Sequence, residues 1–172
     1  MEIKEFQTRF SGKALVLGKN IDTDQIFPGR FLDITDPAEM AKLCLSGLDP
    51  AIAGNFPDRG IIVAGTNFGC GSSRESAVIA LMAMGAGIIA AESFARIFFR
   101  NAINLGLPLI TCPGISEKIS PEDEINIDIL AGEIVVKGSG EILSCPALSE
   151  NALSILSAGG IKALMRQRPG RE

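Results

Sequence analysis

Short apolar runs alternate with helix-like segments through the middle of the chain. Residues 60–65, 86–93 and 107–112 are brief, β-branched or apolar runs bounded by glycine or proline, which is typical of buried strands. Residues 73–85 and 94–106 lie between them, have helical spacing, and end in glycine. The order strand, helix, strand, helix, strand predicts parallel strands joined by right-handed crossovers.

The first third of the chain combines one strand with a long polar segment. Residues 13–18 predict the first strand, and residues 20–37 form a loop, rich in turn residues, that is too long for a simple connector. Residues 36–47 predict a helix with Asp36 as its N-cap and Gly47 as its stop. Because long loops on compact domains often carry function, the 20–37 segment is a candidate site region.

The pattern changes after residue 113. Residues 123–130 and two short runs within 133–143 alternate apolar and polar positions and are separated by glycine turns, which predicts antiparallel strands added to the sheet. The closing segment 148–168 predicts one or two helices, broken at Gly159 and Gly160. The expected fold is therefore α/β, with a parallel βαβαβ core and added antiparallel strands.

Length, charge and the N-terminal segment limit the classes of function. With 172 residues, of which 47% are hydrophobic, residues 1–172 are expected to form a single domain. A net charge of -4 provides no field that would attract nucleic acid or an anionic membrane. The N-terminus has no basic start followed by an apolar stretch, so a cytoplasmic location is expected.

Histidine is absent from the sequence, and the cysteines are scattered. Without histidine, the chain lacks the side chain most often used for acid–base catalysis near neutral pH. Cys44, Cys70, Cys112 and Cys145 contain no C-x-x-C pair, so neither a zinc site nor an iron–sulfur ligand set is expected. We therefore expect this chain to bind no metal.

The stretch "GTNFGCGSSRES", residues 65–76, joins a predicted strand to a predicted helix. Gly65, Gly69 and Gly71 would allow the backbone to approach a ligand closely, and a helix N-terminus presents free N–H groups with partial positive charge. We expect the backbone at Gly69, Cys70 and Gly71 to form a cradle for a small anion.

The side chains that follow indicate a carboxylate as that anion. Arg74 supplies a guanidinium fork that suits a carboxylate. The stretch lacks the lysine of a P-loop, the third glycine of a dinucleotide fingerprint, and a histidine to activate a serine nucleophile. Ser72 and Glu75 also match a helix capping box, a purely structural alternative that is compatible with ligand binding.

A chemical gap remains. The chain offers an anion cradle, but it has no histidine and no metal set, and serine is a poor base at its free pKa. We expect another chain to supply the missing chemistry.

Three motifs in order resemble one known family. Residues 65–76, read with "DTDQIFPGRFL" (22–32) and "ESFARIFFRNAINLGLPLI" (92–110), resemble the small subunits of 3-isopropylmalate dehydratase in the aconitase superfamily. The resemblance spans nearly the whole chain. It implies a swivelling β/β/α domain, like the C-terminal domain of aconitase.

The resemblance also implies a partner and a reaction. A separate large subunit would carry a [4Fe–4S] cluster, in a heterodimer or heterotetramer, and this chain alone would be inactive. The implied activity is that of a hydro-lyase of leucine biosynthesis, which reversibly dehydrates a small dicarboxylate. The alternative from another functional class is a stand-alone anion-binding module.

Roles in the glycine-rich turn follow from the same resemblance. Ser72 matches the catalytic serine, which acts as an alkoxide base, and Ser73 matches a supporting active-site serine. Arg74 matches the arginine that binds a substrate carboxylate. Two more arginines, Arg96 and Arg100, share one helix face at i, i+4 and are expected to be structural or interface residues.

The upstream loop contributes further residues. Thr23 and Asp24 match a turn that approaches the active site, with Thr23 expected among the substrate-binding residues and Asp24 among the catalytic ones. Arg30 falls near a second substrate-binding arginine, but it could equally pair with Asp33 or with the large subunit. These assignments are implied by the resemblance.

The four residues after Arg30 correspond to the segment that selects the substrate. If Phe31, Leu32, Asp33 and Ile34 are extended, Leu32 and Ile34 face one way and could meet an isopropyl group, while Asp33 stays in water. This orientation keeps isopropylmalate, the substrate that the resemblance implies, as the expected one, with citramalate or dimethylmalate as alternatives. Asp33 would repel a third carboxylate, which disfavours homoaconitate.

Overall fold

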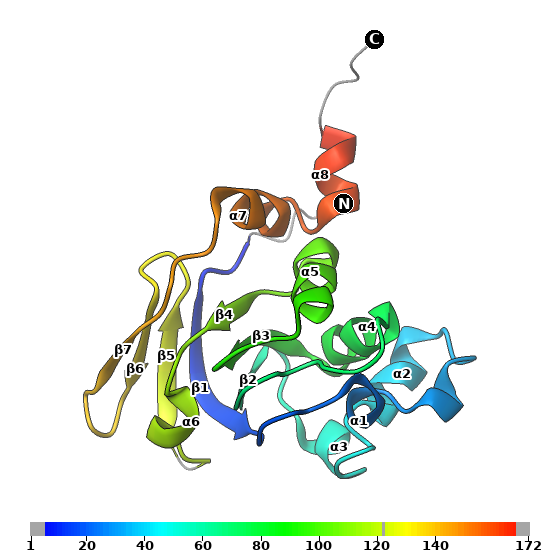
Figure 1. Cartoon of the computed structure of the whole chain (residues 1–172), viewed down its shortest axis with the longest axis horizontal. Helices are drawn as coiled ribbons and strands as arrows, with labels where there is room; N and C mark the ends of the chain where they lie inside the picture. Colours follow the sequence, from blue (N-terminus) through cyan, green and yellow to red (C-terminus); the bar gives the residue numbers. More distant parts are fainter. Residues whose placement is uncertain (1–5, 122, 168–172) are drawn as a thin grey trace.

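The computed structural model describes residues 6–121 and 123–167. Its strands form a seven-stranded sheet in the order β4-β3-β2-β1-β5-β6-β7 (Figure 1). The strands β4, β3, β2 and β1 pair in parallel, each with the next. The strands β1, β5, β6 and β7 pair antiparallel, each with the next. The strands are β1 (Arg9–Val16), β2 (Gly60–Ala64), β3 (Ala86–Ala91), β4 (Leu109–Thr111), β5 (Glu124–Asp128), β6 (Glu133–Val136) and β7 (Ile142–Ser144). The predicted parallel core with added antiparallel strands is confirmed.

β1 connects the two kinds of pairing. Its first half pairs antiparallel with β5, where Phe10 lies opposite Ile127, and its second half pairs parallel with β2, where Leu15 lies opposite Ile62. The strand begins at Arg9, four residues before the predicted start. Residues 9–13 carry a single large apolar side chain, so their strand conformation depends on pairing with a segment more than 100 residues later.

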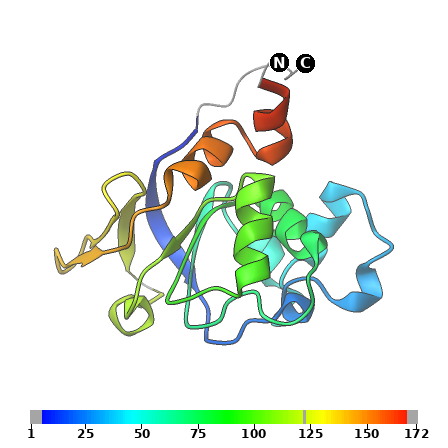
Figure 2. The same ribbon diagram turned by 45° about the horizontal axis from the view of Figure 1, so that its top comes forward.

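The structure has three layers, because the sheet is apolar on both faces. Along β2, Ile61 and Val63 pack into a core shared with the antiparallel strands, while Ile62 and Ala64 pack into a core shared with the helices. In Figures 1 and 2 the helices α4 and α5 and the strands β5 to β7 lie on opposite sides of the parallel strands. The arrangement is β/β/α, as the sequence resemblance implied.

Two helices cover the parallel strands, α4 (Glu75–Met84) and α5 (Arg96–Leu105). Both end where predicted, at Gly85 and Gly106, which are left-handed with φ of 111° and 93°. Both begin later than predicted. Ser93 precedes α5 by three residues, and its hydroxyl accepts the N–H of Asn67 at 2.8 Å.

The predicted capping box of Ser72 and Glu75 is wrong. Arg74 occupies the N-cap position of α4 in an extended conformation, and no side chain caps the helix. A capping box does exist at α1 (Thr23–Ile26), where the N–H of Gln25 donates to Asp22 at 2.7 Å and the N–H of Asp22 donates back to Gln25 at 3.0 Å.

The segment between β1 and β2 contains four short helical elements: α1, the 3-10 helix η1 (Gly29–Phe31), α2 (Pro37–Leu43) and α3 (Ile52–Asn55). Asp36 caps α2 as predicted and accepts the N–H of Glu39 at 2.9 Å. The helix ends four residues before Gly47, because Leu45 adopts a φ of 59° and donates to Ile26. A Cβ at Gly47 would lie 2.5 Å from the Cα of Gln25, so this glycine permits close packing on α1 and is not the helix stop.

The remaining helices are α6 (Ile115–Lys118), α7 (Glu150–Ser157) and α8 (Ile161–Gln167). Gly159 and Gly160, with φ of 82° and 114°, separate α7 from α8, which confirms the predicted break. No helix within residues 6–121 and 123–167 is long and apolar enough to cross a membrane.

Candidate functional site

Three segments that are far apart in the sequence meet at the carboxyl ends of the parallel strands. The loop after β1, the glycine-rich turn after β2 and the start of α5 after β3 are hydrogen-bonded in series. The N–H of Gly69 donates to Ile21 at 2.7 Å, that of Thr23 to Cys70 at 2.9 Å, and that of Ala95 to Phe68 at 2.9 Å. These three segments contain the three motifs of the sequence resemblance, and this edge of a parallel sheet is a common place for ligand sites.

Close packing explains the glycines of the turn. Gly69 has a φ of 78°, and a Cβ there would lie 2.1 Å from Cγ of Phe98 on α5. Gly71 has a φ of 91°. Gly65 is buried, and a Cβ there would lie 3.1 Å from the backbone of Lys19, so its role is packing and not ligand approach. The N–H of Gly69 already donates to Ile21, so it is not available to a ligand. Gly69 therefore contributes to the shape of the cradle and not to its donors.

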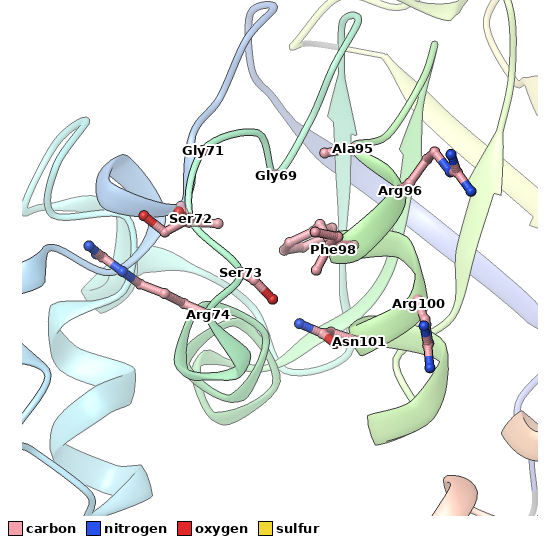
Figure 3. A pocket seen from close by; sticks show the side chains of 12 residues that line it. Gly69, Gly71, Ser72, Ser73, Arg74, Ala95, Arg96, Phe98, Arg100 and Asn101 are labelled. Atoms are coloured by element: carbon pink, nitrogen blue, oxygen red, sulfur yellow. The ribbon is translucent and has the colours of Figure 1, made fainter.

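A cavity of about 440 Å³ opens between the turn and α5 (Figure 3). In Figure 3 the hydroxyl of Ser73 points toward Asn101, whereas the side chains of Ser72 and Arg74 point away from α5. The turn therefore presents its side chains in two directions. The lining residues are Thr23, Gly69, Gly71, Ser72, Ser73, Arg74, Ala95, Arg96, Ile97, Phe98, Arg100 and Asn101.

The tip of the turn is exposed and polar. Gly71, Ser72 and Ser73 are all exposed. Within the described part of the chain, neither the two serine hydroxyls nor the backbone N–H groups of these three residues make a hydrogen bond. Together with the N-terminus of α4, they form a set of donors free to receive an anionic ligand.

Arg74 is held by the loop after β1. Its Nη1 lies 2.9 Å from Oδ1 of Asp24, and the same oxygen accepts the N–H of Gly29 at 2.8 Å. The Arg74 side chain is 24% exposed, against 66% for Asp24, so the guanidinium is the more enclosed member of the pair. The hydrogen bonds from Arg74 and Gly29 lower the pKa of Asp24 below its ordinary value of 3.8, and the charge of Arg30 adds to this effect.

Thr23 is the one polar residue among those described that is buried as a whole, at 2% exposure. It is the first residue of α1, and it lines the cavity beside Gly71. The structure thus brings Thr23, Asp24 and Arg74 together with both serines.

The 31–34 segment is not extended, contrary to expectation. The 3-10 helix ends at Phe31, Leu32 is helical, and the N–H of Ile34 donates to Phe31 at 2.9 Å. Phe31 and Ile34 therefore pack together against the core, while Leu32 and Asp33 are exposed. The predicted pairing of Leu32 with Ile34 is wrong because the chain turns after Arg30.

Arg30 lies near the site without lining the cavity. Its guanidinium carbon sits 4.5 Å from the ring centroid of Phe31, a cation–π contact. No ion pair joins Arg30 to Asp33 among the described residues.

Sequence reasoning missed the wall of the cavity on α5. Phe98 and Asn101 were not singled out, and Arg96 and Arg100 were not placed at the cavity. The topology contained the signal: β2 and β3 are adjacent parallel strands, so the turn after one must lie beside the helix after the other.

Within residues 6–121 and 123–167, no cluster of three or more cysteine and carboxylate side chains could hold a metal ion. The four cysteines are free thiols. Cys44, Cys112 and Cys145 are buried, whereas Cys70 is partly exposed.

Comparison with known proteins shows extensive similarity. Residues 55–113 match the family described as the aconitase C-terminal domain. The chain is 46% identical to the isopropylmalate/citramalate isomerase small subunit of Methanocaldococcus jannaschii over 157 residues, which are 91% of this chain and 94% of that protein. It is also 46% identical to the 3-isopropylmalate dehydratase small subunit 1 of Methanopyrus kandleri over 160 residues, 93% of this chain and 94% of that one.

A solved structure is also similar. The crystal structure of 3-isopropylmalate dehydratase from Methanocaldococcus jannaschii superimposes with a TM-score of 0.87 at 40% identity. The match covers 92% of this chain and 94% of that chain.

Proposed function

The chain belongs to the family of 3-isopropylmalate dehydratase small subunits, and we propose that it provides one half of an active site that interconverts 2-isopropylmalate and 3-isopropylmalate. The observation that carries this proposal is that Thr23, Ser72, Ser73 and Arg74 all border one open cavity, with Asp24 paired to Arg74. A hydro-lyase of leucine biosynthesis needs an anion site for its dicarboxylate substrate and a base that removes a proton from carbon, and both would lie at this cavity.

The reaction is an elimination followed by an addition. A proton leaves the carbon next to a carboxylate, hydroxide leaves the neighbouring carbon, and water then adds across the double bond in the opposite sense. We assign the proton transfer at carbon to Ser72. A [4Fe–4S] cluster on a separate large subunit supplies, when bound, a Lewis acid for the departing hydroxyl and a carboxylate.

The surroundings of Ser72 support its role as a base. A free serine hydroxyl is far too weakly acidic, so its alkoxide needs fixed donors and nearby positive charge. The unpaired N–H groups of Gly71 to Ser73, the N-terminus of α4 and Arg74 meet this need. Because α4 begins at Glu75, the Ser72 hydroxyl does not cap this helix, and capping does not compete with a role as a base.

Arg74 is the proposed binding group for a substrate carboxylate. Asp24 engages Nη1 and leaves the rest of the guanidinium fork for a second carboxylate. Asp24 is therefore a positioning residue for Arg74 in this proposal, and Thr23 and Ser73 line the space where the substrate would lie. Arg30 stands next to this pair and is proposed as a secondary carboxylate contact.

Leu32 is the proposed contact for the alkyl group of the substrate. It is 44% exposed, and it is the exposed apolar residue of the 31–34 segment. Citramalate is the main alternative substrate, since the Methanocaldococcus relative is named for both isopropylmalate and citramalate. Dimethylmalate remains a further alternative, and the exposed Asp33 disfavours homoaconitate.

The proposed assembly is a cytoplasmic heterodimer or heterotetramer with the large subunit. Relatives named as small subunits support a partner of this kind. The free thiols of the four cysteines are compatible with a reducing compartment.

The test is anaerobic reconstitution with the cluster-bearing large subunit, followed by turnover assays with isopropylmalate, citramalate, dimethylmalate and homocitrate. We expect isopropylmalate to be turned over with the highest kcat/KM, and this chain alone to be inactive. Preference for citramalate would keep the mechanism and change the pathway. Activity on none of the four would contradict the proposal and favour a stand-alone anion-binding module.

A further inference from the structure

The wall of the cavity opposite Arg74 carries positive charge that the chemistry above does not use. Arg96 and Arg100 lie one turn apart on α5, both are exposed, and both line the cavity. Within the described residues, neither guanidinium makes an ion pair or a hydrogen bond. The chain as a whole is acidic, so this pair is a local exception to its charge.

An exposed apolar surface accompanies the two arginines. Ile97 is 54% exposed, an uncommon state for a large apolar side chain in the first turn of a helix whose other face is buried. It lies beside Arg100 at i, i+3 and lines the same cavity. The single isopropyl group of the proposed substrate is assigned to Leu32, so Ile97 is left for another contact.

The same surface continues past the start of α5 into a second hollow. This hollow of about 400 Å³ is lined by Arg96 together with Ser93, Thr111 and the half-buried rings of Phe94 and Phe99. The two rings contact each other edge to face, with centroids 5.8 Å apart. Arginine and aromatic residues are enriched in the cores of protein interfaces, and this patch combines both with an exposed isoleucine.

We propose that Arg96, Ile97 and Arg100, with the hollow at Phe94 and Phe99, form the docking surface for the cluster-bearing large subunit, which meets them with carboxylate side chains and an apolar residue. This inference rests on the proposed function. The cavity is open on one side, and its serines need a second protein wall to complete the site. A partner that reaches Ser73 must lie over α5, because α5 forms the other rim of the cavity (Figure 3).

The test is the affinity of the purified large subunit for charge-reversed variants, measured by sedimentation or calorimetry without substrate. Arg96→Glu and Arg100→Glu should weaken association by about 10- to 100-fold each, as expected for reversing a charge at a complementary interface. Arg166→Glu on α8 makes the same charge change at an exposed site away from the cavity and should leave affinity unchanged. Thermal melting of each variant verifies that it folds.

Two further measurements separate docking from substrate binding. Ile97→Asp should weaken association, whereas Leu130→Asp, at a residue that is 62% exposed in the antiparallel layer, should not. With the large subunit at saturating concentration, the double variant Arg96→Gln, Arg100→Gln should retain the kcat and KM of the unmodified chain. Its association should also depend less steeply on salt.

Unchanged affinity in the reversed variants would overturn the docking proposal even if the enzyme is active. A raised KM at saturating large subunit with normal affinity would also overturn it, because the arginines would then bind substrate. The affinity of the two subunits is measured without substrate, and turnover is measured in a separate assay. If the substrate assignment is wrong, the affinity measurement therefore still tests the docking proposal.

Discussion

Neighbouring side chains in the turn after β2 point to different sides, and this separates their roles. Ser73 faces Asn101 across the cavity, whereas Ser72 and Arg74 face away from α5 (Figure 3), and Arg74 reaches Asp24. The separation has a backbone cause. Gly69 and Gly71 take positive φ values, and Arg74 is extended, so the turn does not have the regular rotation of a helix.

Ser72→Ala should lower kcat by about 10²- to 10⁴-fold, the usual range for loss of a general base. The large subunit should still bind, because the Ser72 hydroxyl makes no hydrogen bond among the described residues whose loss would change the turn. Steady-state kinetics of the reconstituted enzyme measures the effect. Ser76→Ala, in the first turn of α4, is the matched control, and equal kinetics for both variants would remove Ser72 from the mechanism.

Arg74→Lys should raise KM by about 10- to 100-fold, the equivalent of one charge-assisted hydrogen bond. Lysine keeps the charge but has no planar fork, so it cannot hold Asp24 and a substrate carboxylate in the same geometry. Steady-state kinetics separates KM from kcat. An unchanged KM would show that the substrate carboxylate binds elsewhere.

Asp24 should titrate below its ordinary pKa of 3.8, because Arg74 and the N–H of Gly29 favour the carboxylate. A lowered pKa means that the ion pair is complete above the ordinary pKa and is lost only as pH falls through the lowered value. Carboxyl NMR of the isolated chain measures this. Arg74→Gln should move the pKa of Asp24 upward, and no movement would show that Gly29 alone holds the carboxylate.

At the scale of elements, the contact between the turn and α5 holds the cavity open. Gly69 packs against Phe98, whose ring makes edge-to-face contacts with Phe68 at 5.3 Å between centroids. The turn and the helix are thus joined by a small aromatic cluster, which defines the width of the cavity that Ser73 and Asn101 face.

Gly69→Ala should destabilise the fold by about 2–4 kcal/mol, from a positive φ and from overpacking against Phe98. Chemical denaturation of the isolated chain measures the free energy of unfolding. Gly18→Ala is the control, because a Cβ there has no neighbour within 4 Å and its φ is not left-handed. Similar stability for the two variants would show that the Phe98 ring moves aside easily.

Element boundaries show where local patterns were sufficient. Gly85 and Gly106 end their helices as predicted, since a left-handed C-cap is a local property of glycine. The starts of α4 and α5 were predicted too early. At the first, the Arg74–Asp24 pair, 50 residues apart in sequence, holds the backbone extended at the point where serine chemistry would favour a cap.

At the scale of the whole molecule, the proposed active site is shared between this chain and a partner. Its described residues hold no metal cluster, its cavity is open, and Arg74 already has a carboxylate partner in Asp24. A dicarboxylate meeting the isolated chain would compete with Asp24 and lack a second wall.

The melting temperature of the isolated chain should therefore rise by less than about 1 °C in ~10 mM 3-isopropylmalate, because stabilisation by a ligand depends on the ratio of its concentration to its Kd. Differential scanning fluorimetry is sufficient. The reconstituted assembly, melted with the same ligand, is the positive control. A shift of several degrees in the isolated chain would mean that this subunit binds substrate without its partner.

The sequence by itself determined the order of the main strands and helices and the parallel core with its antiparallel addition, and it led us to expect outside chemistry. These depend on hydrophobic period, on glycine and proline at chain turns, and on the absence of histidine, all of which act over a few residues or over composition. The three motifs also predicted a site region and its candidate residues, which the structure places close together.

Only the tertiary structure decided how those residues face one another. It turned the 31–34 segment so that Leu32 is exposed and Ile34 is packed, paired Arg74 with Asp24, and brought α5 to the other side of the cavity. Each of these outcomes depends on contacts that local sequence patterns do not encode, either packing against the core or contacts between distant residues such as Asp24 and Arg74, which are 50 positions apart. The free energy of such contacts exceeds the small preferences of individual residues for helix or extended backbone.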